Sequence, residues 1–186
     1  LYNLESKDKT LVKEQEIPSG HNPDNYIVER IECPSHDGRM VPITITRHKD
    51  TVLDGSSNLL LYGYGSYGNS MSPGFSSTRL SLINRNIIWV TAHIRGGMER
   101  GMKWWKEGKL LNKKNTFEDY IAVGKYLIEK KYTSQGKIIG MGGSAGGLLM
   151  GAVVNQMPEL FLGIIMAVPF VDSLTTNLDH SLPLTV

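Results

Sequence analysis

The sequence predicts an α/β fold built on a mostly parallel β-sheet. Short continuous apolar runs, typical of strands buried on both faces, occur at 58–62, 87–92 and 163–168. Stretches with helical spacing separate them, and strands that alternate with helices imply a parallel sheet covered on both faces. A β-rich pair at 26–33 and 40–46, joined by an Asp-Gly turn, adds an antiparallel hairpin in front.

Residues 1–25 precede this pattern. Residues 1–4 and 10–12 are short strand candidates, and such a hairpin is marginal on its own, so it needs a sheet to join. Residues 15–25 contain two prolines and a glycine and predict a linker. In the hairpin that follows, Pro42 lacks an N–H group and favours an edge position.

Helices are predicted between the strands. Residues 78–84 can form one, and the clearest starts at Thr116, which forms a capping-box pattern with Asp119. The apolar residues of this second helix recur on one face and predict core packing. They are Phe117, Tyr120, Ile121, Gly124, Leu127 and Ile128.

A G-x-S-x-G pattern centred on Ser144 lies between a predicted strand at 136–140 and a predicted helix at 148–156. This context is typical of a nucleophile elbow. Gly142 and Gly146 remove the side chains that would collide at so sharp a turn. The helix N-terminus offers free N–H groups to a developing oxyanion. The alternative is a glycine-rich turn with a solvent-facing serine.

A nucleophilic serine needs a base, usually a histidine oriented by a carboxylate, in the order Ser, acid, His. After Ser144 the acids are Glu159, Asp172 and Asp179, and the one histidine is His180. Asp172 follows a strand, but His180 comes only eight residues later, too soon for another strand and helix. We therefore interpret both as loop residues and expect a nucleophile without its base, while a triad of Asp172 and His180 stays an alternative.

Three loops are expected together at the carboxyl ends of the strands: 63–70, 93–101 and 141–147. His93 lies in the second. Because it precedes the serine, against the order of this fold class, we expect a hydrogen-bonded histidine near the site rather than the base.

Composition narrows the function classes. The chain has 186 residues and a net charge of +2, and no apolar run approaches the ~20 residues that cross a bilayer. Cys33 is the single cysteine, which excludes an intrachain disulfide and favours a reducing, cytoplasmic location. The polar N-terminus does not resemble a signal peptide, and the absence of an initiator methionine indicates a fragment or a processed piece.

Other chemistries find little support. The glycine pairs lack a phosphate-loop lysine and the histidines lack ligand spacing, so no cofactor or metal is expected. The lysines of 103–114 surround Trp104 and Trp105, but nearby acids and the small net charge argue against nucleic acid. A solvated loop and helix start is the interpretation of this stretch.

Several longer stretches carry a resemblance to a known family. They are LLLYGYGSYG (59–68), HIRGGMERG (93–101), KKNTFEDY (113–120), MGGSAGGLLMG (141–151), NQMPELF (155–161) and VPFVDSLTTNLDHSLPLT (168–185). The sequence resembles the catalytic domain of the prolyl oligopeptidase family, and more closely its oligopeptidase B (protease II) branch. The resemblance implies an α/β-hydrolase fold, here incomplete and without its final strands. It implies that 26–186 is the N-terminal portion of the catalytic domain, and 1–25 the remnant of a β-propeller end and linker.

The resemblance also implies site residues. Ser144 matches the nucleophile, and the oxyanion hole would use the N–H of Ala145 and the hydroxyl of Tyr64. Tyr67 matches an aromatic residue that lines the primary specificity pocket. A packing role in the loop is the alternative for each tyrosine.

Departures from the family pattern qualify these expectations. The family's triad aspartate and histidine, and the acids that bind a basic P1 side chain, match positions beyond Val186. Ser72 and Gly74 replace a pair of aspartates found in some members, which leaves subsite preference open. The hypothesis is a fragment of a serine oligopeptidase that cleaves short peptides after Arg or Lys, with the rest of the catalytic domain and the propeller as partners. The alternatives are a truncated or split product without activity, and a small esterase of the same fold.

Overall fold

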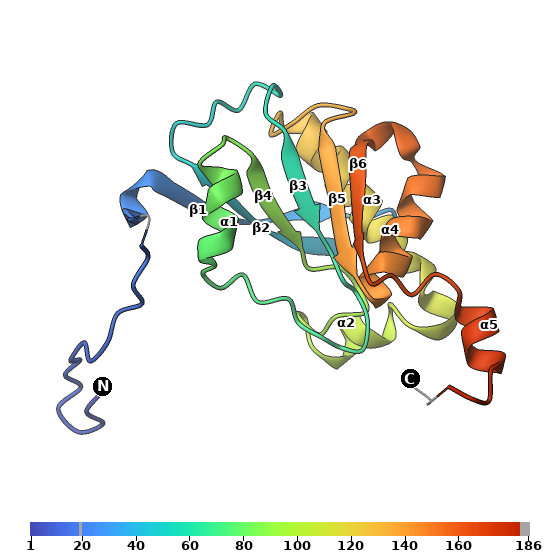
Figure 1. The fold of residues 1–186 in the computed structure, drawn as a ribbon, viewed down its shortest axis with the longest axis horizontal. Coiled ribbons are helices and arrows are strands. Elements are labelled where there is room, and N and C mark those ends of the chain that lie inside the picture. Colours follow the sequence, from blue (N-terminus) through green and yellow to red (C-terminus); the bar gives the residue numbers. More distant parts are fainter. Residues whose placement is uncertain (19, 183–186) are drawn as a thin grey trace.

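The computed structural model describes residues 1–18 and 20–182, which contain a six-stranded sheet in the order β1-β2-β4-β3-β5-β6 (Figure 1). The β1–β2 and β2–β4 pairs are antiparallel, and the other three pairs are parallel. The predicted α/β class is therefore confirmed. The strands are β1 Tyr26–Pro34, β2 Met40–His48, β3 Leu59–Tyr62, β4 Ile88–Ala92, β5 Ile138–Gly143 and β6 Phe161–Ala167.

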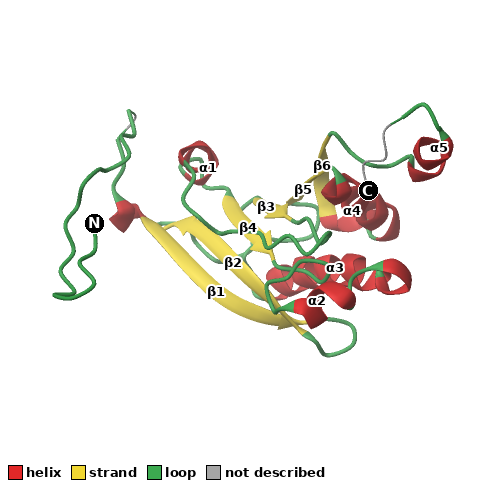
Figure 2. Cartoon of the chain, turned by 90° about the horizontal axis from the view of Figure 1, so that it is seen from below, coloured by secondary structure: helices red, strands yellow, loops and turns green. Residues whose placement is uncertain are grey.

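The helices are α1 Ser77–Ile83, α2 Met102–Lys106, α3 Lys114–Glu129, α4 Ala145–Gln156 and α5 Ser173–Leu178. Short 3₁₀ turns lie at Pro23–Asn25, Leu110–Asn112 and Pro158–Leu160. Figure 2 shows α1 on one face of the sheet and α3 and α4 on the other. Within the described ranges, no helix combines the length and apolar character that crossing a membrane requires.

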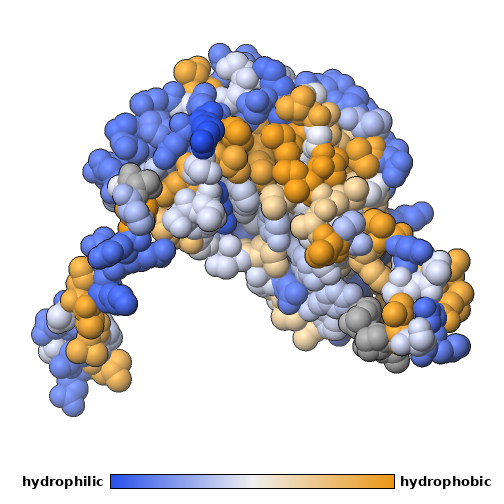
Figure 3. Space-filling model, viewed as in Figure 1, coloured by the Kyte–Doolittle hydropathy of each residue, from blue (hydrophilic) through white to orange (hydrophobic). Residues whose placement is uncertain are grey.

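The prediction that helices cover both faces of the sheet is confirmed only in part. Figure 3 shows an apolar area over β5 and β6, on the same face of the sheet as α1 but beyond the part that α1 covers. On β6, Leu162, Ile165 and Met166 are between 43% and 59% exposed. In the described part of the chain, β6 is an edge strand.

The opening hairpin pairs from Tyr26 opposite His48 to Pro34 opposite Met40. β1 lies at the sheet edge as predicted, but β2 has a partner on both sides, so the edge position expected for Pro42 is wrong. The sheet tolerates this proline because pairing with β4 begins one residue later. The Pro42 carbonyl accepts a hydrogen bond from the His93 N–H at 3.0 Å.

The N-terminal segment lies apart from the sheet (Figure 1). Residues 1–10 close on themselves through one antiparallel bridge between Tyr2 and Lys9, and the Thr10 N–H donates to the Leu1 carbonyl at 2.9 Å. Within the described ranges, this segment pairs with none of the six strands. The predicted hairpin is thus reduced to a single bridge.

The core lies between the sheet and α3. The predicted stripe of α3 is confirmed, because Tyr120, Ile121, Gly124 and Leu127 are buried and the other two members are partly buried. Each such large apolar side chain contributes roughly 1.5–3 kcal/mol when fully buried. The Tyr120 hydroxyl donates to the Leu61 carbonyl at 2.6 Å, so its polar end is satisfied inside the core.

The start of α3 differs from the prediction. The helix begins at Lys114, so Thr116 lies inside its first turn rather than at the cap. The Thr116 hydroxyl donates to the Arg95 carbonyl at 2.8 Å, and Asp119 binds the Arg95 side chain. The capping box is wrong because tertiary contacts occupy both of its side chains.

Candidate active site

Ser144 occupies a sharp turn between β5 and α4. Its backbone lies at φ +53° and ψ −117°, a conformation that side-chain-bearing residues rarely adopt. Two hydrogen bonds fix the turn: the Ser144 N–H donates to the Ala167 carbonyl at 2.9 Å, and its carbonyl accepts from the Phe170 N–H at 3.0 Å. The side chain is exposed. The predicted strand–turn–helix geometry is confirmed.

Close backbone approaches explain the two flanking glycines. A Cβ atom on Gly142 would overlap the Gly146 carbonyl, and one on Gly146 would lie 2.9 Å from the Gly63 carbonyl oxygen. Both obstructions are backbone atoms, which cannot rotate away. The elbow therefore requires glycine at both positions.

We expect Gly142→Ala to destabilise the protein by at least the 1–3 kcal/mol typical of an overpacked site. The control is Gly163→Ala on β6, where an added Cβ meets nothing within 4 Å. It should be neutral or stabilising by up to about 1 kcal/mol. Urea denaturation of the two variants measures the difference, and equal stabilities would contradict the overlap argument.

Tyr64 lies directly after β3 and packs against the elbow. Its ring atom Cδ2 lies 3.4 Å from the Cβ position of Gly146, and the residue is half-buried. Ala145, the first residue of α4, is 5% exposed, and an N–H in this first turn has no partner within the helix. The structure thus brings Tyr64, Ser144 and Ala145 to one place.

Tyr67 lies at the edge of the same place. Its ring centroid is 6.5 Å from that of Tyr64, and the residue is 53% exposed, with φ at +57°. The exposed ring is open to a bound molecule.

The three predicted loops meet as expected. The Gly63 N–H donates to the Met141 carbonyl at 3.1 Å, which joins the first loop to the third segment. That segment is not a loop as predicted, because β5 extends to Gly143 and α4 begins at Ala145. The Gly68 N–H donates to the Gly96 carbonyl at 2.9 Å, which joins the first to the second.

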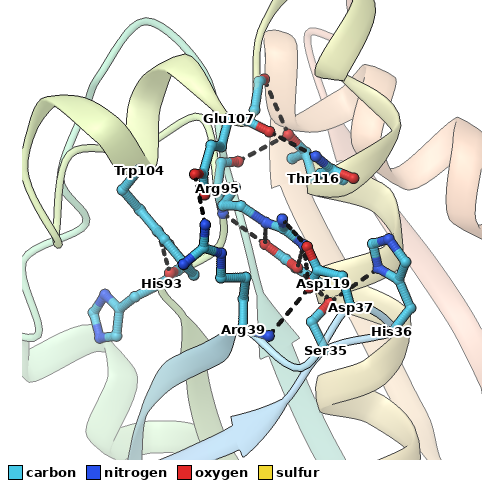
Figure 4. Close-up of polar contacts among 12 residues, drawn as sticks. Ser35, His36, Asp37, Arg39, His93, Arg95, Trp104, Glu107, Thr116 and Asp119 are labelled. Atoms are coloured by element: carbon cyan, nitrogen blue, oxygen red, sulfur yellow. Dashed lines mark hydrogen bonds and ion pairs between the residues drawn. The ribbon is translucent and has the colours of Figure 1, made fainter.

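A buried ion-pair network centres on Arg95, in the second of these loops (Figure 4). Arg95 donates from Nε and Nη2 to the two carboxylate oxygens of Asp119, at 2.9 and 2.6 Å, and from Nη1 to Asp37 at 2.6 Å. The Arg95 and Asp119 side chains are 1% and 0% exposed. The Arg95 N–H also donates to Asp119 at 3.0 Å.

This network joins three distant parts of the chain: the hairpin turn, the 93–101 loop and α3. Burial alone would lower the pKa of Arg95, but the hydrogen bonds that Arg95 donates to Asp119 and Asp37, and the charges of these carboxylates, raise it. Such bidentate contacts fix geometry as well as charge. No local pattern in the sequence links Asp37, Arg95 and Asp119, so the sequence did not predict the network.

The histidine and acid candidates do not assemble a triad. His93 is 1% exposed, with Nε2 2.8 Å from the Thr44 hydroxyl and Nδ1 3.6 Å from Glu99. This agrees with the prediction that His93 is not the base. Asp172 caps α5 by accepting from the Thr175 N–H at 3.1 Å.

His180 is exposed. In residues 1–18 and 20–182, no hydrogen bond or ion pair joins it to Asp172 or to Ser144. The interpretation of both as loop residues holds, with Asp172 serving as a helix cap.

The basic stretch is less solvated than predicted. The side chain of Lys103 is 75% exposed, but Lys113 is half-buried and donates to the Gly65 carbonyl at 2.5 Å and to the Ser66 hydroxyl at 2.8 Å. Burial lowers the pKa of Lys113 to about 8. Trp104 is buried as well.

The remaining reactive groups suggest no second centre. Burial, together with the charge of Asp119, raises the pKa of the Cys33 thiol to about 12, so the thiol stays protonated and unreactive. Across the described ranges, no three His, Cys, Asp or Glu side chains lie close enough together to hold a metal ion.

Comparison with known families decides the family. A model described as "Prolyl oligopeptidase family" matches residues 73–186. The chain belongs to the prolyl oligopeptidase family. Its fold corresponds to part of the family's α/β-hydrolase domain.

Individual members of the prolyl oligopeptidase family resemble nearly the whole chain. Dipeptidyl aminopeptidase BI of Pseudoxanthomonas mexicana is 46% identical over 98% of this chain and 25% of its own length. Protease 2 of Moraxella lacunata is 44% identical over 98% of this chain and 26% of its own. The chain thus spans about a quarter of the length of these relatives.

Solved structures agree. Oligopeptidase B from Leishmania major superposes with a TM-score of 0.92 at 43% identity, covering 99% of this chain and 26% of that one. Oligopeptidase B from Trypanosoma brucei, solved in a closed form with covalently bound antipain, also gives 0.92, at 40% identity and the same coverage.

Proposed function

We propose that Ser144 is the acyl-forming nucleophile of a serine oligopeptidase of the oligopeptidase B branch, which hydrolyses short peptides after Arg or Lys. One observation carries the proposal. Ser144 is held exposed in a strained elbow, and Tyr64, from a neighbouring strand end, packs on the elbow's own Gly146.

In this proposal the Ser144 hydroxyl attacks the carbonyl carbon of the scissile peptide bond and loses its proton to a base. The carbonyl oxygen, on which negative charge develops, accepts hydrogen bonds from the Ala145 N–H and the Tyr64 hydroxyl. The amine leaves with a proton, and water then hydrolyses the acyl-enzyme. Loss of one such donor typically raises the barrier by about 3–4 kcal/mol.

The same proposal assigns roles to the other parts of the enzyme. Residues 26–186 would be the N-terminal portion of the catalytic domain, and residues 1–25 the end of a propeller and its linker. The triad acid and histidine would come from a further part of the catalytic domain, with the propeller as a second partner. Tyr67 would contact the peptide, and the enzyme would work in the cytoplasm.

A second candidate function uses the same acyl-enzyme chemistry but requires a substrate with a free N-terminus. The relative from Pseudoxanthomonas mexicana is named "Dipeptidyl aminopeptidase BI", a name that denotes removal of dipeptides from a free N-terminus. Two dipeptide reporters that end in arginyl-aminomethylcoumarin separate the candidates, one with a free and one with a blocked N-terminus. Cleavage of the blocked reporter supports the oligopeptidase, and cleavage of the free one alone supports the dipeptidyl enzyme. An ester reporter cleaved in preference to both would favour an esterase.

Covalent labelling tests the nucleophile directly. We expect a fluorophosphonate probe to label Ser144 rapidly in the natural polypeptide that carries these residues. The 186-residue chain alone should label slowly, because none of its described histidines contacts Ser144. Peptide mass spectrometry locates the label. Absence of labelling in the natural polypeptide would overturn the proposal. Rapid labelling of the 186-residue chain would favour the alternative in which Asp172 and His180 complete a triad with Ser144.

A further inference from the structure

Lys113 is an unusual lysine. It lies at the N-terminal boundary of α3 and is half-buried, and no carboxylate lies within ion-pair distance of its ammonium group among the described residues. Placing an ammonium group in such a site is unfavourable unless hydrogen bonds replace the lost water. Among the described residues, the ammonium group donates two hydrogen bonds, both to the loop 63–70 that contains Tyr64. The acceptors are the Gly65 carbonyl at 2.5 Å and the Ser66 hydroxyl at 2.8 Å.

The Gly65 carbonyl belongs to the peptide that follows Tyr64. Gly65 has φ +68°, and a Cβ there would overlap the Thr116 side chain, so α3 presses on this residue from one side. From the other side, the Gly65 carbonyl lies where a Cβ of Gly96 would be. The carbonyl is enclosed, and Lys113 is its recorded side-chain donor.

The chain before Tyr64 is fixed independently. The Gly63 N–H is bonded to Met141 on β5, and the Tyr120 ring lies 2.8 Å from the Cβ position of Gly63. Lys113 holds the chain after Tyr64 in the corresponding way. With both sides fixed, the direction of the Tyr64 side chain is set by backbone that cannot swing.

We propose that Lys113 is a positioning residue for the Tyr64 hydroxyl: its ammonium holds the Gly65 peptide so that Tyr64 points at the oxyanion formed by Ser144. This inference rests on the proposed function. It assigns Lys113 a role through Tyr64 and no contact with the substrate.

The expected result of Lys113→Met is a fall in kcat of roughly 10- to 100-fold, the scale on which a small misplacement of a catalytic group acts. KM should stay within about two-fold, because a donor to the transition-state oxyanion contributes little to ground-state binding. Lys114→Met is the control, since Lys114 is the next residue, is exposed and lies on the same helix. It should leave both constants unchanged.

A double-mutant cycle separates positioning from general damage. If Lys113 acts through Tyr64, the double variant Lys113→Met with Tyr64→Phe should be no slower than Tyr64→Phe alone, within about two-fold. A purely structural role predicts multiplication of the two losses instead. Thermal unfolding checks that Lys113→Met remains folded, as we expect because methionine carries no charge to desolvate.

Each outcome supports or overturns one of the two proposals. Unchanged kcat in Lys113→Met beside a strong loss in Tyr64→Phe overturns the inference and leaves the proposed function standing. Multiplied losses in the double variant do the same. A wild-type polypeptide whose activity does not depend on Ser144 overturns the proposed function itself. All measurements use the natural polypeptide and a blocked arginyl-aminomethylcoumarin reporter.

Discussion

Replacement of Ser144 by alanine is expected to lower kcat of the natural polypeptide on an arginyl reporter by about a million-fold. In the proposed mechanism the Ser144 hydroxyl forms the covalent bond of the acyl-enzyme, and alanine offers no atom that can form it. The exposed elbow itself should survive, because a methyl group needs no more room than a hydroxymethyl group. Active-site titration and steady-state kinetics on the two proteins measure the effect.

The matched control for this substitution is Ser77→Ala, another exposed serine, at the start of α1. It should leave kcat unchanged. A loss of less than about ten-fold in Ser144→Ala would mean that a different residue forms the acyl-enzyme. The elbow would then be a structural turn.

The second large effect is expected at Asp119. Asp119→Ala removes both acceptors from one edge of the Arg95 guanidinium, which stays 1% exposed with Asp37 as its remaining carboxylate. Breaking a buried pair from one side typically destabilises a protein by about 3–5 kcal/mol, because a charge is left without its partner. Urea denaturation, with the midpoint and slope fitted separately, measures this loss.

The control lies on the same helix. Glu129→Ala removes a carboxylate from α3 that is 70% exposed and, among the described residues, paired only with its neighbour Lys130. Surface pairs of this kind contribute about 0–1 kcal/mol. Similar losses in the two variants would show that Asp119 acts as an ordinary surface acid, contrary to its burial.

Local patterns in the sequence predicted the main elements well. The apolar runs became β3, β4 and β6, the one-faced stripe became α3, and the G-x-S-x-G motif became a turn between strand and helix. Each of these signals depends on residues close together in the chain. The short helices α2 and α5 were not predicted, because five or six residues give too few repeats to show a helical period.

The wrong predictions share a different cause. Thr116 and Asp119 match a local capping pattern, yet Arg95, more than twenty residues away in sequence, engages both of them. Pro42 satisfies an edge rule, yet it lies where β2 has not yet begun to pair with β4. Lys113 belongs to a basic run, yet the fold turns it onto Gly65. In each case tertiary structure decides what a side chain contacts.

The candidate site divides along the same line. Loops at the ends of adjacent parallel strands must meet, so the proximity of Tyr64 to Ser144 follows from topology. The family resemblance, rather than any spacing, suggested which tyrosine would matter. Among the described residues, no hydrogen bond or ion pair joins a histidine to Ser144. The short distance between Asp172 and His180 along the chain is the reason why no triad was expected from them.

Two of the close approaches that place Tyr64 against Ser144 have main-chain atoms on both sides. The Gly63 carbonyl faces Gly146, and the Gly65 carbonyl faces Gly96. These two approaches depend on the absence of a Cβ atom rather than on the size of any core side chain. The same arrangement leaves no second-site repair, because no neighbouring side chain can shrink to admit a methyl group at Gly142. Variation should accumulate freely around this junction and hardly at all within it.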